Sequence, residues 1–281
     1  MIETGRINRL QVLRHSDFGL FLDGGEDGDI LLPKRHVSDE LACKPGDWLE
    51  VFVYFDSEDR LVATTETPRV QVGQFASLKV VDINRVGLFL DWGLAKDLLL
   101  PHSEEKRPLQ VGDYCVVYVF LDQRTRRIAA SARIDRYLDK LPAHYSVGEE
   151  VDLLVVSSTE MGFKAIINDQ HWGLIHRNEL FRQLRSGLRV KGYISQLRAD
   201  GKISLSLQPV GGEAREELSE QIMARLRDNN GILPLSDKST PQAISAAFSV
   251  SKNNFKKALG GLYKQGRITI HADHIELVEK P

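Results

Sequence analysis

The same five residues occur twice in this chain. Gly-Leu-Phe-Leu-Asp begins at Gly19 and again at Gly87, 68 positions later. At the same spacing, Leu-Leu-Pro ends first at Pro33 and then at Pro101. A period of this length indicates repeated structural units that stand one after another. The repeat constrains the fold more than any composition figure, because one kind of unit must accommodate both copies.

A third, weaker copy follows at an offset of 75. Gly162 takes the place of Gly87, and Gly187 precedes the segment "LRVKGYISQL" as Gly112 precedes its own apolar run. This copy closes on "ADGKISLSLQP". The three copies cover residues 4–66, 73–134 and 148–208.

The sequence pattern of each unit predicts five short strands. Val, Ile, Leu and Phe dominate the runs, and Gly, Asp and Pro mark the breaks. In the fourth run of the first unit, Val51, Val53 and Phe55 alternate, so we expect one buried face. Five strands in about 62 residues favour a small barrel over an open sheet, because closure removes exposed edges. The glycine before Leu-Phe-Leu indicates a strand bend or a close approach of two backbones. The runs of the first unit lie at residues 5–16, 19–24, 29–34, 48–56 and 61–66.

The C-terminal segment changes from a period of 2 to a period of 3.6. Leu218, Ile222 and Leu226 share one face of a predicted helix. Thr240, followed by proline, and Ser251 are hydroxyl caps that predict the starts of two more helices. The segment "RITIHADHIELVE" then predicts a two-stranded hairpin. Three helices and a hairpin make a winged helix.

The repeated units resemble the S1-type RNA-binding domain, a five-stranded OB barrel. The resemblance rests on "DFGLFLD", on the "LLP" or "LIH" block before a short helix, and on the closing "DRLVATT" or "DGKISLSL". Three such units before a winged helix are similar to the conserved virulence factor B family of bacteria. The predicted fold class is mainly β with a C-terminal α+β domain. The predicted domains are S1-type barrels at residues 1–68, 69–136 and 137–210 and a winged helix at residues 211–281.

The resemblance implies a stacking platform made of two aromatic residues of the second strand and a histidine after the third. Bases stack on such rings with little regard to sequence. No unit keeps the whole platform: Pro33 replaces the histidine in the first, and Met161 and Lys164 replace both rings in the third. Burial in a barrel core remains an alternative for the strand phenylalanines, and a plug under a loop for the tryptophan. The candidates are Phe18, Phe21, Phe89, Trp92, His102 and His176.

Charge differs sharply between the units. Residues 1–66 hold 7 Lys or Arg against 14 Asp or Glu, a net charge of −7. Since phosphate binding needs cations, we expect this unit to bind RNA poorly, and its surface suits a basic protein partner. From His171 to Gln208 the balance reverses, which predicts phosphate contacts, with an ordinary solvated surface as the alternative. The cationic candidates are Arg177, Arg182, Arg185, Arg189, Lys191, Arg198 and Lys202.

The third helix of the winged helix offers polar and basic side chains near its start, where a recognition helix meets nucleic acid. The domain is nearly neutral, with 10 basic and 9 acidic residues in 213–281, so protein docking remains open. His271 and His274 lie three apart in the wing, but no carboxylate or thiol pattern completes a metal site, and a solvated turn is the preferred interpretation. The candidate contacts are Lys252, Asn253, Lys256 and Lys257.

The length, cysteine count, charge and motifs of the chain limit the classes of function that it can have. It has 281 residues, two cysteines and a net charge of −2, and no run approaches the roughly 20 apolar residues of a membrane helix. We therefore expect a cytoplasmic protein without a disulfide framework or a membrane partner. Neither a phosphate-cradling glycine loop nor a His-Glu-x-x-His motif occurs, so we expect no enzyme and no cofactor.

These observations predict an RNA-binding regulatory protein that contacts single-stranded RNA and controls gene expression post-transcriptionally. Duplex nucleic acid is a second expected ligand, through the winged helix. Two alternatives stay open. One is a protein-interaction adaptor associated with the ribosome or with RNA machinery, and the other is a winged-helix DNA-binding transcription regulator.

Overall fold

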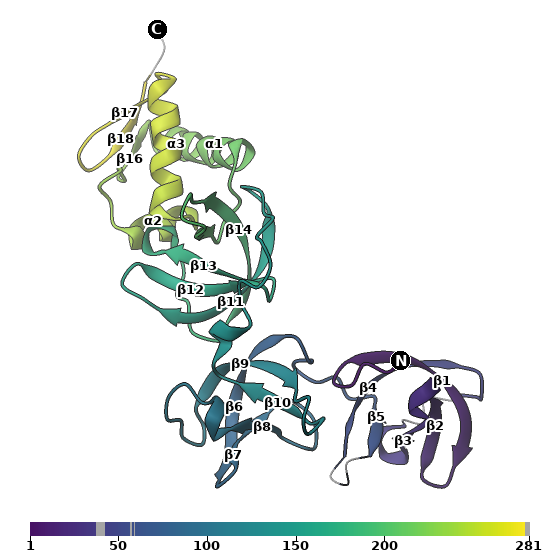
Figure 1. Cartoon of the computed structure of the whole chain (residues 1–281). Helices are drawn as coiled ribbons and strands as arrows, with labels where there is room; N and C mark the ends of the chain where they lie inside the picture. Colours follow the sequence, from purple (N-terminus) through teal and green to yellow (C-terminus); the bar gives the residue numbers. More distant parts are fainter. Residues whose placement is uncertain (38–42, 57, 59, 279–281) are drawn as a thin grey trace. The chain divides into compact units, whose positions relative to one another are not determined.

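The computed structural model describes residues 1–37, 43–56, 58 and 60–278 (Figure 1). The chain divides into two compact units, Met1–Tyr137 and Leu138–Pro281. The first unit contains two closed barrels, and the second contains a third barrel and a helical domain. The predicted boundaries of four domains are a finer division than this, and they stay predictions.

The three barrels have the same five-stranded construction. The first barrel comprises β1 (Ile7–Ser16), β2 (Gly19–Asp23), β3 (Asp29–Pro33), β4 (Trp48–Phe55) and β5 (Leu61–Thr64), with single turns η1 (Gly25–Asp27) and η2 (Lys34–His36). The second comprises β6 (Phe75–Asn84), β7 (Gly87–Asp91), β8 (Leu98–Pro101), β9 (Tyr114–Leu121) and β10 (Ile128–Ser131), with η3 (His102–Glu104) and η4 (Ile134–Arg136). The third comprises β11 (Glu150–Ser158), β12 (Gly162–Ile167), β13 (His171–His176), β14 (Arg189–Leu197) and β15 (Ile203–Ser206), with η5 (Arg177–Glu179).

Strand order is identical in all three, β1-β2-β3-β5-β4 in the first barrel, and the third and fifth strands pair in parallel. The prediction of a mainly β chain of three barrels is confirmed. The short helix expected after each third strand is one turn of 3-10 helix.

The repeated glycine of the second strand is required by a backbone contact. A Cβ atom built on Gly19, Gly87 or Gly162 would lie only 2.0, 2.3 or 2.0 Å from a carbonyl oxygen of the neighbouring third strand. Real Cβ atoms do not approach an oxygen so closely, so a larger residue would push the two strands apart. The expected close approach of two backbones is confirmed.

The cores of the first two barrels join. Val51 and Val53 are buried inside the first barrel, as the alternation predicts. Phe52 and Tyr54 on the opposite face are buried as well, because they belong to one apolar cluster with Trp92 and other residues of the second barrel. The prediction of a single buried face was therefore incomplete, since a neighbouring barrel covers the outer one.

The C-terminal domain has the expected helices. They are α1 (Gly212–Asp228), α2 (Pro241–Phe248) and α3 (Lys252–Lys264), and the wing strands are β17 (Ile268–Ile270) and β18 (Ile275–Leu277). Thr240 and Ser251 cap α2 and α3, each accepting a backbone N–H at 3.2 Å. The sequence analysis missed β16 (Ile232–Leu233), which pairs with β18 and makes the sheet three-stranded. Two residues are too short a run to show a period.

None of the helices in the described part of the chain is both long enough and apolar enough to cross a membrane.

The glycine contact predicts the effect of a small substitution. Gly162→Ala should destabilise the second unit by about 1–3 kcal/mol, because the added methyl group overlaps the backbone of β13. The midpoint of thermal unfolding, followed by circular dichroism, should fall by about 3–10 °C. Gly260→Ala is the matched control, since it lies within α3 with open space around it and should be neutral or slightly stabilising. Equal stability of the two variants would contradict the contact.

Candidate nucleic-acid interface

The first barrel presents aromatic rings on its outer face. Phe18 lies in the turn before β2 and is 74% exposed. Phe21 is partly buried in β2 and pairs across the ladder with Leu31 of β3. The guanidinium carbon of Arg14 lies 3.9 Å from the centroid of the Phe21 ring. A hollow of about 650 Å³ lies beside Phe21. Because unpaired RNA bases stack on aromatic rings and on arginine planes, this face is suited to bind them.

Arginines accompany these rings although the barrel as a whole is acidic. Arg14 pairs with Asp29 at 2.9 Å, and Arg35 lines the hollow. Arg60 donates two hydrogen bonds to Asp56, at 3.0 and 2.8 Å. Partial burial by itself would raise the pKa of Asp56, but the hydrogen bonds from Arg60 outweigh it and hold that pKa below its ordinary value. Three arginines therefore lie on this face of an acidic barrel, two of them paired with carboxylates.

In the second barrel the tryptophan is a core residue. Trp92 is only 3% exposed, and its indole N–H donates to the carbonyl of Lys96 at 2.6 Å. Its ring packs edge-on against Phe52, with centroids 5.6 Å apart. The prediction that Trp92 stacks on RNA does not fit this geometry, because the ring is enclosed between two barrels. Phe89 stays partly exposed on β7, and the exposed Val86 stands at the position of Phe18.

His102 is exposed but already has partners. Its Nε2 lies 2.8 Å from the carbonyl of Asn84, and its Nδ1 makes a short contact with Glu105. The Glu105 carboxylate and the Asn84 carbonyl raise the pKa of His102. These two acceptors favour the protonated ring and hold it at the start of η3.

The third barrel has a ring that the sequence analysis missed. Met161 and Lys164 occupy the two aromatic positions, as predicted from the sequence, but Trp172 on β13 faces the same side. The Lys164 Nζ lies 3.7 Å from the centroid of the Trp172 ring. His176 is partly buried, with its Nε2 3.2 Å from the hydroxyl of Ser204. The strand register would have shown that Trp172 lies on the side of Lys164 and His176.

The seven cationic candidates of the third barrel are spread over η5, the following loop, β14 and the turn after it. Most are held by carboxylates or carbonyls, and exposed pairs of this kind contribute only about 0–1 kcal/mol each. Arg182 lies near the Phe181 ring, Arg185 is exposed, and Lys202 lines the hollow beside Trp172. The pairs are Arg177 with the carbonyls of Thr159 and Glu160, Arg189 with Asp169, Lys191 with Glu150 and Asp152, and Arg198 and Lys202 with Asp200.

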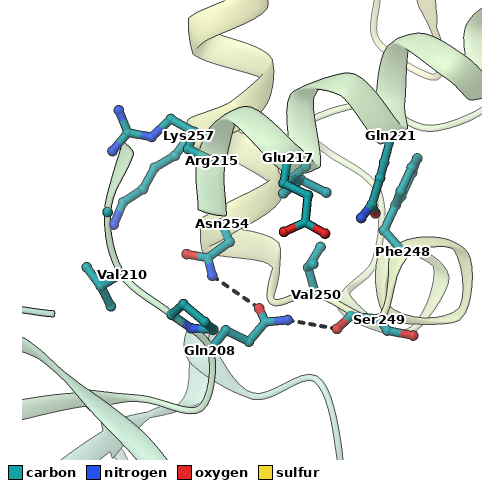
Figure 2. Close-up of a pocket in the computed structure, with 13 residues that line it drawn as sticks. Gln208, Val210, Arg215, Glu217, Gln221, Phe248, Ser249, Val250, Asn254 and Lys257 are labelled. Carbon is teal, nitrogen blue, oxygen red and sulfur yellow. Dashed lines mark hydrogen bonds between the residues drawn. The ribbon is translucent and has the colours of Figure 1, made fainter. Parts of the chain in front are cut away.

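The start of α3 is docked on the third barrel. The buried carboxylate of Glu179 accepts a hydrogen bond from Ser251 at 3.3 Å and a short one from Asn253. Gln208 accepts from the backbone N–H of Ser251 at 3.0 Å and from Asn254 at 3.1 Å. Figure 2 shows Gln208 bonded to Asn254 and to the Ser249 carbonyl. Asn253 as a nucleic-acid contact does not fit this arrangement, because its amide is used inside the second unit.

Two of the three lysines in the first half of α3 are more exposed than the residues docked at its start. Lys256 and Lys257 are exposed, and Lys252 is partly buried. Lys256 lies 4.0 Å from Asp237, and Lys257 lines a small hollow of about 250 Å³ beside Arg215. These three lysines are the part of the predicted winged-helix contact that the structure leaves accessible.

A carboxylate does accompany the two wing histidines, contrary to the sequence analysis. One ligand atom each of His271, His274 and Glu276 lies within 4.8 Å of the others. The two rings, however, stack with centroids 4.3 Å apart and only 13° between their planes. Lone pairs of imidazole nitrogens lie in the ring plane, so parallel rings cannot meet at one ion until one of them rotates. We therefore retain the interpretation of a solvated turn.

Comparison with known proteins agrees with this architecture. Residues 4–66 and 72–131 match the S1 domain, and residues 220–277 match the CvfB-like winged helix domain. The chain is therefore a protein of the class that has tandem S1 domains followed by a winged helix.

The chain belongs to the conserved virulence factor B family, as the resemblance predicted. It is 35% identical over 278 residues to "Uncharacterized protein YitL" of Bacillus subtilis, covering 95% of this chain and 91% of that protein. It is 28% identical to the conserved virulence factor B of Staphylococcus epidermidis, covering 99% and 95%. A crystal structure of a multidomain protein with nucleic acid binding domains from Streptococcus pneumoniae is 25% identical over 98% of both chains, with a TM-score of 0.41.

Proposed function

We propose that this chain is a cytoplasmic RNA-binding regulator that holds single-stranded RNA on the outer faces of its S1 barrels and controls gene expression after transcription. The observation that carries the proposal is the face of the first barrel, where Phe18 is exposed and Phe21 lies under Arg14. Rings and an arginine plane together are the surface on which unpaired bases stack.

Binding would be shared among several weak faces. Each base stacked on an aromatic ring contributes about 1–3 kcal/mol, which alone gives modest affinity. Faces on one chain raise the local concentration of RNA for one another, so their affinities combine. The exposed ion pairs of the third barrel exchange readily with phosphates, which supports an affinity that falls as salt rises.

The contacts at the start of α3 bear on the choice between an RNA-binding and a DNA-binding regulator. A DNA-binding regulator would insert the start of its recognition helix into the major groove. Here Ser251 and Asn253 at that end are bonded to Glu179, which argues against this use of α3. A protein-interaction adaptor remains the second candidate, because the acidic first barrel suits a basic partner.

Phe18→Ala tests the proposal. The side chain is exposed, so folding should be unaffected, while the affinity of the full chain for a labelled single-stranded RNA should fall about 5- to 150-fold. Fluorescence anisotropy at physiological salt measures this change. Trp48→Ala is the control, because this exposed ring lines a different hollow of the same barrel, beside Arg9. Equal affinities of the two variants, or no RNA binding by the unmodified protein, would contradict the proposal.

The double variant Lys256→Glu and Lys257→Glu tests the role of α3. Because the start of the helix is docked, the affinity for single-stranded RNA should fall by less than about threefold, or about 0.6 kcal/mol. Arg227→Glu with Lys238→Glu makes the same charge change at two exposed positions outside α3. A loss above tenfold in the first variant alone would restore nucleic-acid contact by this helix. If that loss were confined to duplex DNA, the transcription-regulator alternative would gain support.

A further inference from the structure

The third barrel differs from the first at two diagonal positions on the outer face of its second and third strands. In the first barrel, Phe21 pairs with Leu31, and Asp29 lies two residues before Leu31 on the same side of β3. In the third barrel, Lys164 pairs with Leu174, and Trp172 lies two residues before Leu174. The ring has therefore moved from the second strand to the third. At these two positions an aromatic residue and a carboxylate are replaced by a lysine and an aromatic residue.

Trp172 belongs to an outward row on β13. Burial alternates along this strand: His171, Gly173 and Ile175 are buried, while Trp172, Leu174 and His176 are partly exposed. The row ends on Trp172 at one side and on His176 at the other, four residues apart, a distance of about 13 Å along a strand. Two rings on one strand face thus remain in the barrel that lacks both aromatic residues of the second-strand motif.

A hollow of about 600 Å³ lies against Trp172. Met161, Leu174 and Ile203 give it apolar walls, and Lys164 and Lys202 supply cations. Two carboxylates also border it, those of Asp139 and Glu160. That of Asp139 already accepts the backbone N–H of Trp172 at 3.1 Å. A flat apolar ligand with attached negative charge fits this combination, and an unpaired nucleotide is such a ligand.

We infer that Trp172 is the base-stacking residue of the third barrel, and that Lys164 leaves its ring for an RNA phosphate when a base binds. The inference rests on the proposed RNA-binding function and names a further contact for it. An exposed cation–π contact changes an equilibrium constant about 2- to 5-fold, whereas stacking of a base changes it about 5- to 150-fold. Stacking therefore outweighs the contact that it displaces. The released ammonium group then lies beside the backbone of the bound nucleotide.

Trp172→Ala and Trp172→Phe in the full chain test the inference with a labelled single-stranded RNA of mixed sequence. Trp172→Ala should lower the affinity about 5- to 150-fold, while Trp172→Phe keeps a stacking ring and should stay within about threefold. Lys164→Ala should make the dependence of binding on salt shallower by about one released counterion. Trp48→Ala is the matched control, as an exposed tryptophan outside this hollow.

Tryptophan fluorescence provides a readout that a structural role would not change. RNA should lower the tryptophan emission of the unmodified protein. In Trp172→Phe, RNA should still bind, but the share of this decrease that comes from Trp172 should be absent. If Trp172→Ala does not fold, the fluorescence of Trp172→Phe alone tests whether a base stacks on Trp172. Unchanged quenching in Trp172→Phe, or equal affinities of Trp172→Ala and Trp48→Ala, would overturn the inference and leave the proposed function intact. Failure of the unmodified protein to bind RNA would remove both.

Discussion

The contact between the second and third strands fixes what each barrel presents on its surface. A glycine of the second strand lies so close to a carbonyl oxygen of the third that a residue with a side chain does not fit there, which disfavours a shifted register. That register directs Phe21, Phe89 and Lys164 outward in the three barrels and keeps their neighbours in the core. A slip by one residue would bury these side chains and expose apolar ones. The recurring glycine before Leu-Phe-Leu-Asp is therefore required by the structure.

On this common framework the barrels carry different side chains on their outer faces. The first barrel carries rings beside an arginine, and the third carries Trp172 under Lys164. In the second barrel, Trp92 is buried in the contact with the first barrel, where it packs on Phe52. In the second unit, the buried Glu179 holds the start of α3 against the third barrel, which makes the winged helix part of that barrel's surroundings.

Sequence reasoning succeeded where local patterns decide the structure. The five strands of each barrel and the caps of α2 and α3 follow from periodicity and from single residues such as Thr240, so they could be predicted. The location of Trp92 could not, because its burial depends on Phe52, 40 positions earlier in another barrel. A charge count over residues 1–66 does not show where charges lie, and the structure places Arg14, Arg35 and Arg60 near one face; weak RNA binding by this barrel stays a prediction. Trp172 could have been found by pairing the strands before comparing residues.

We propose that RNA lies on the outer faces of the first and third barrels. Ultraviolet crosslinking of RNA to the full chain in cells, with the crosslinked peptides mapped by mass spectrometry, tests it most directly. Crosslinks are expected in the peptide that contains Phe18 and Phe21 and in the peptide that contains Trp172. Crosslinks confined to residues 213–278, with none on these two faces, would contradict it.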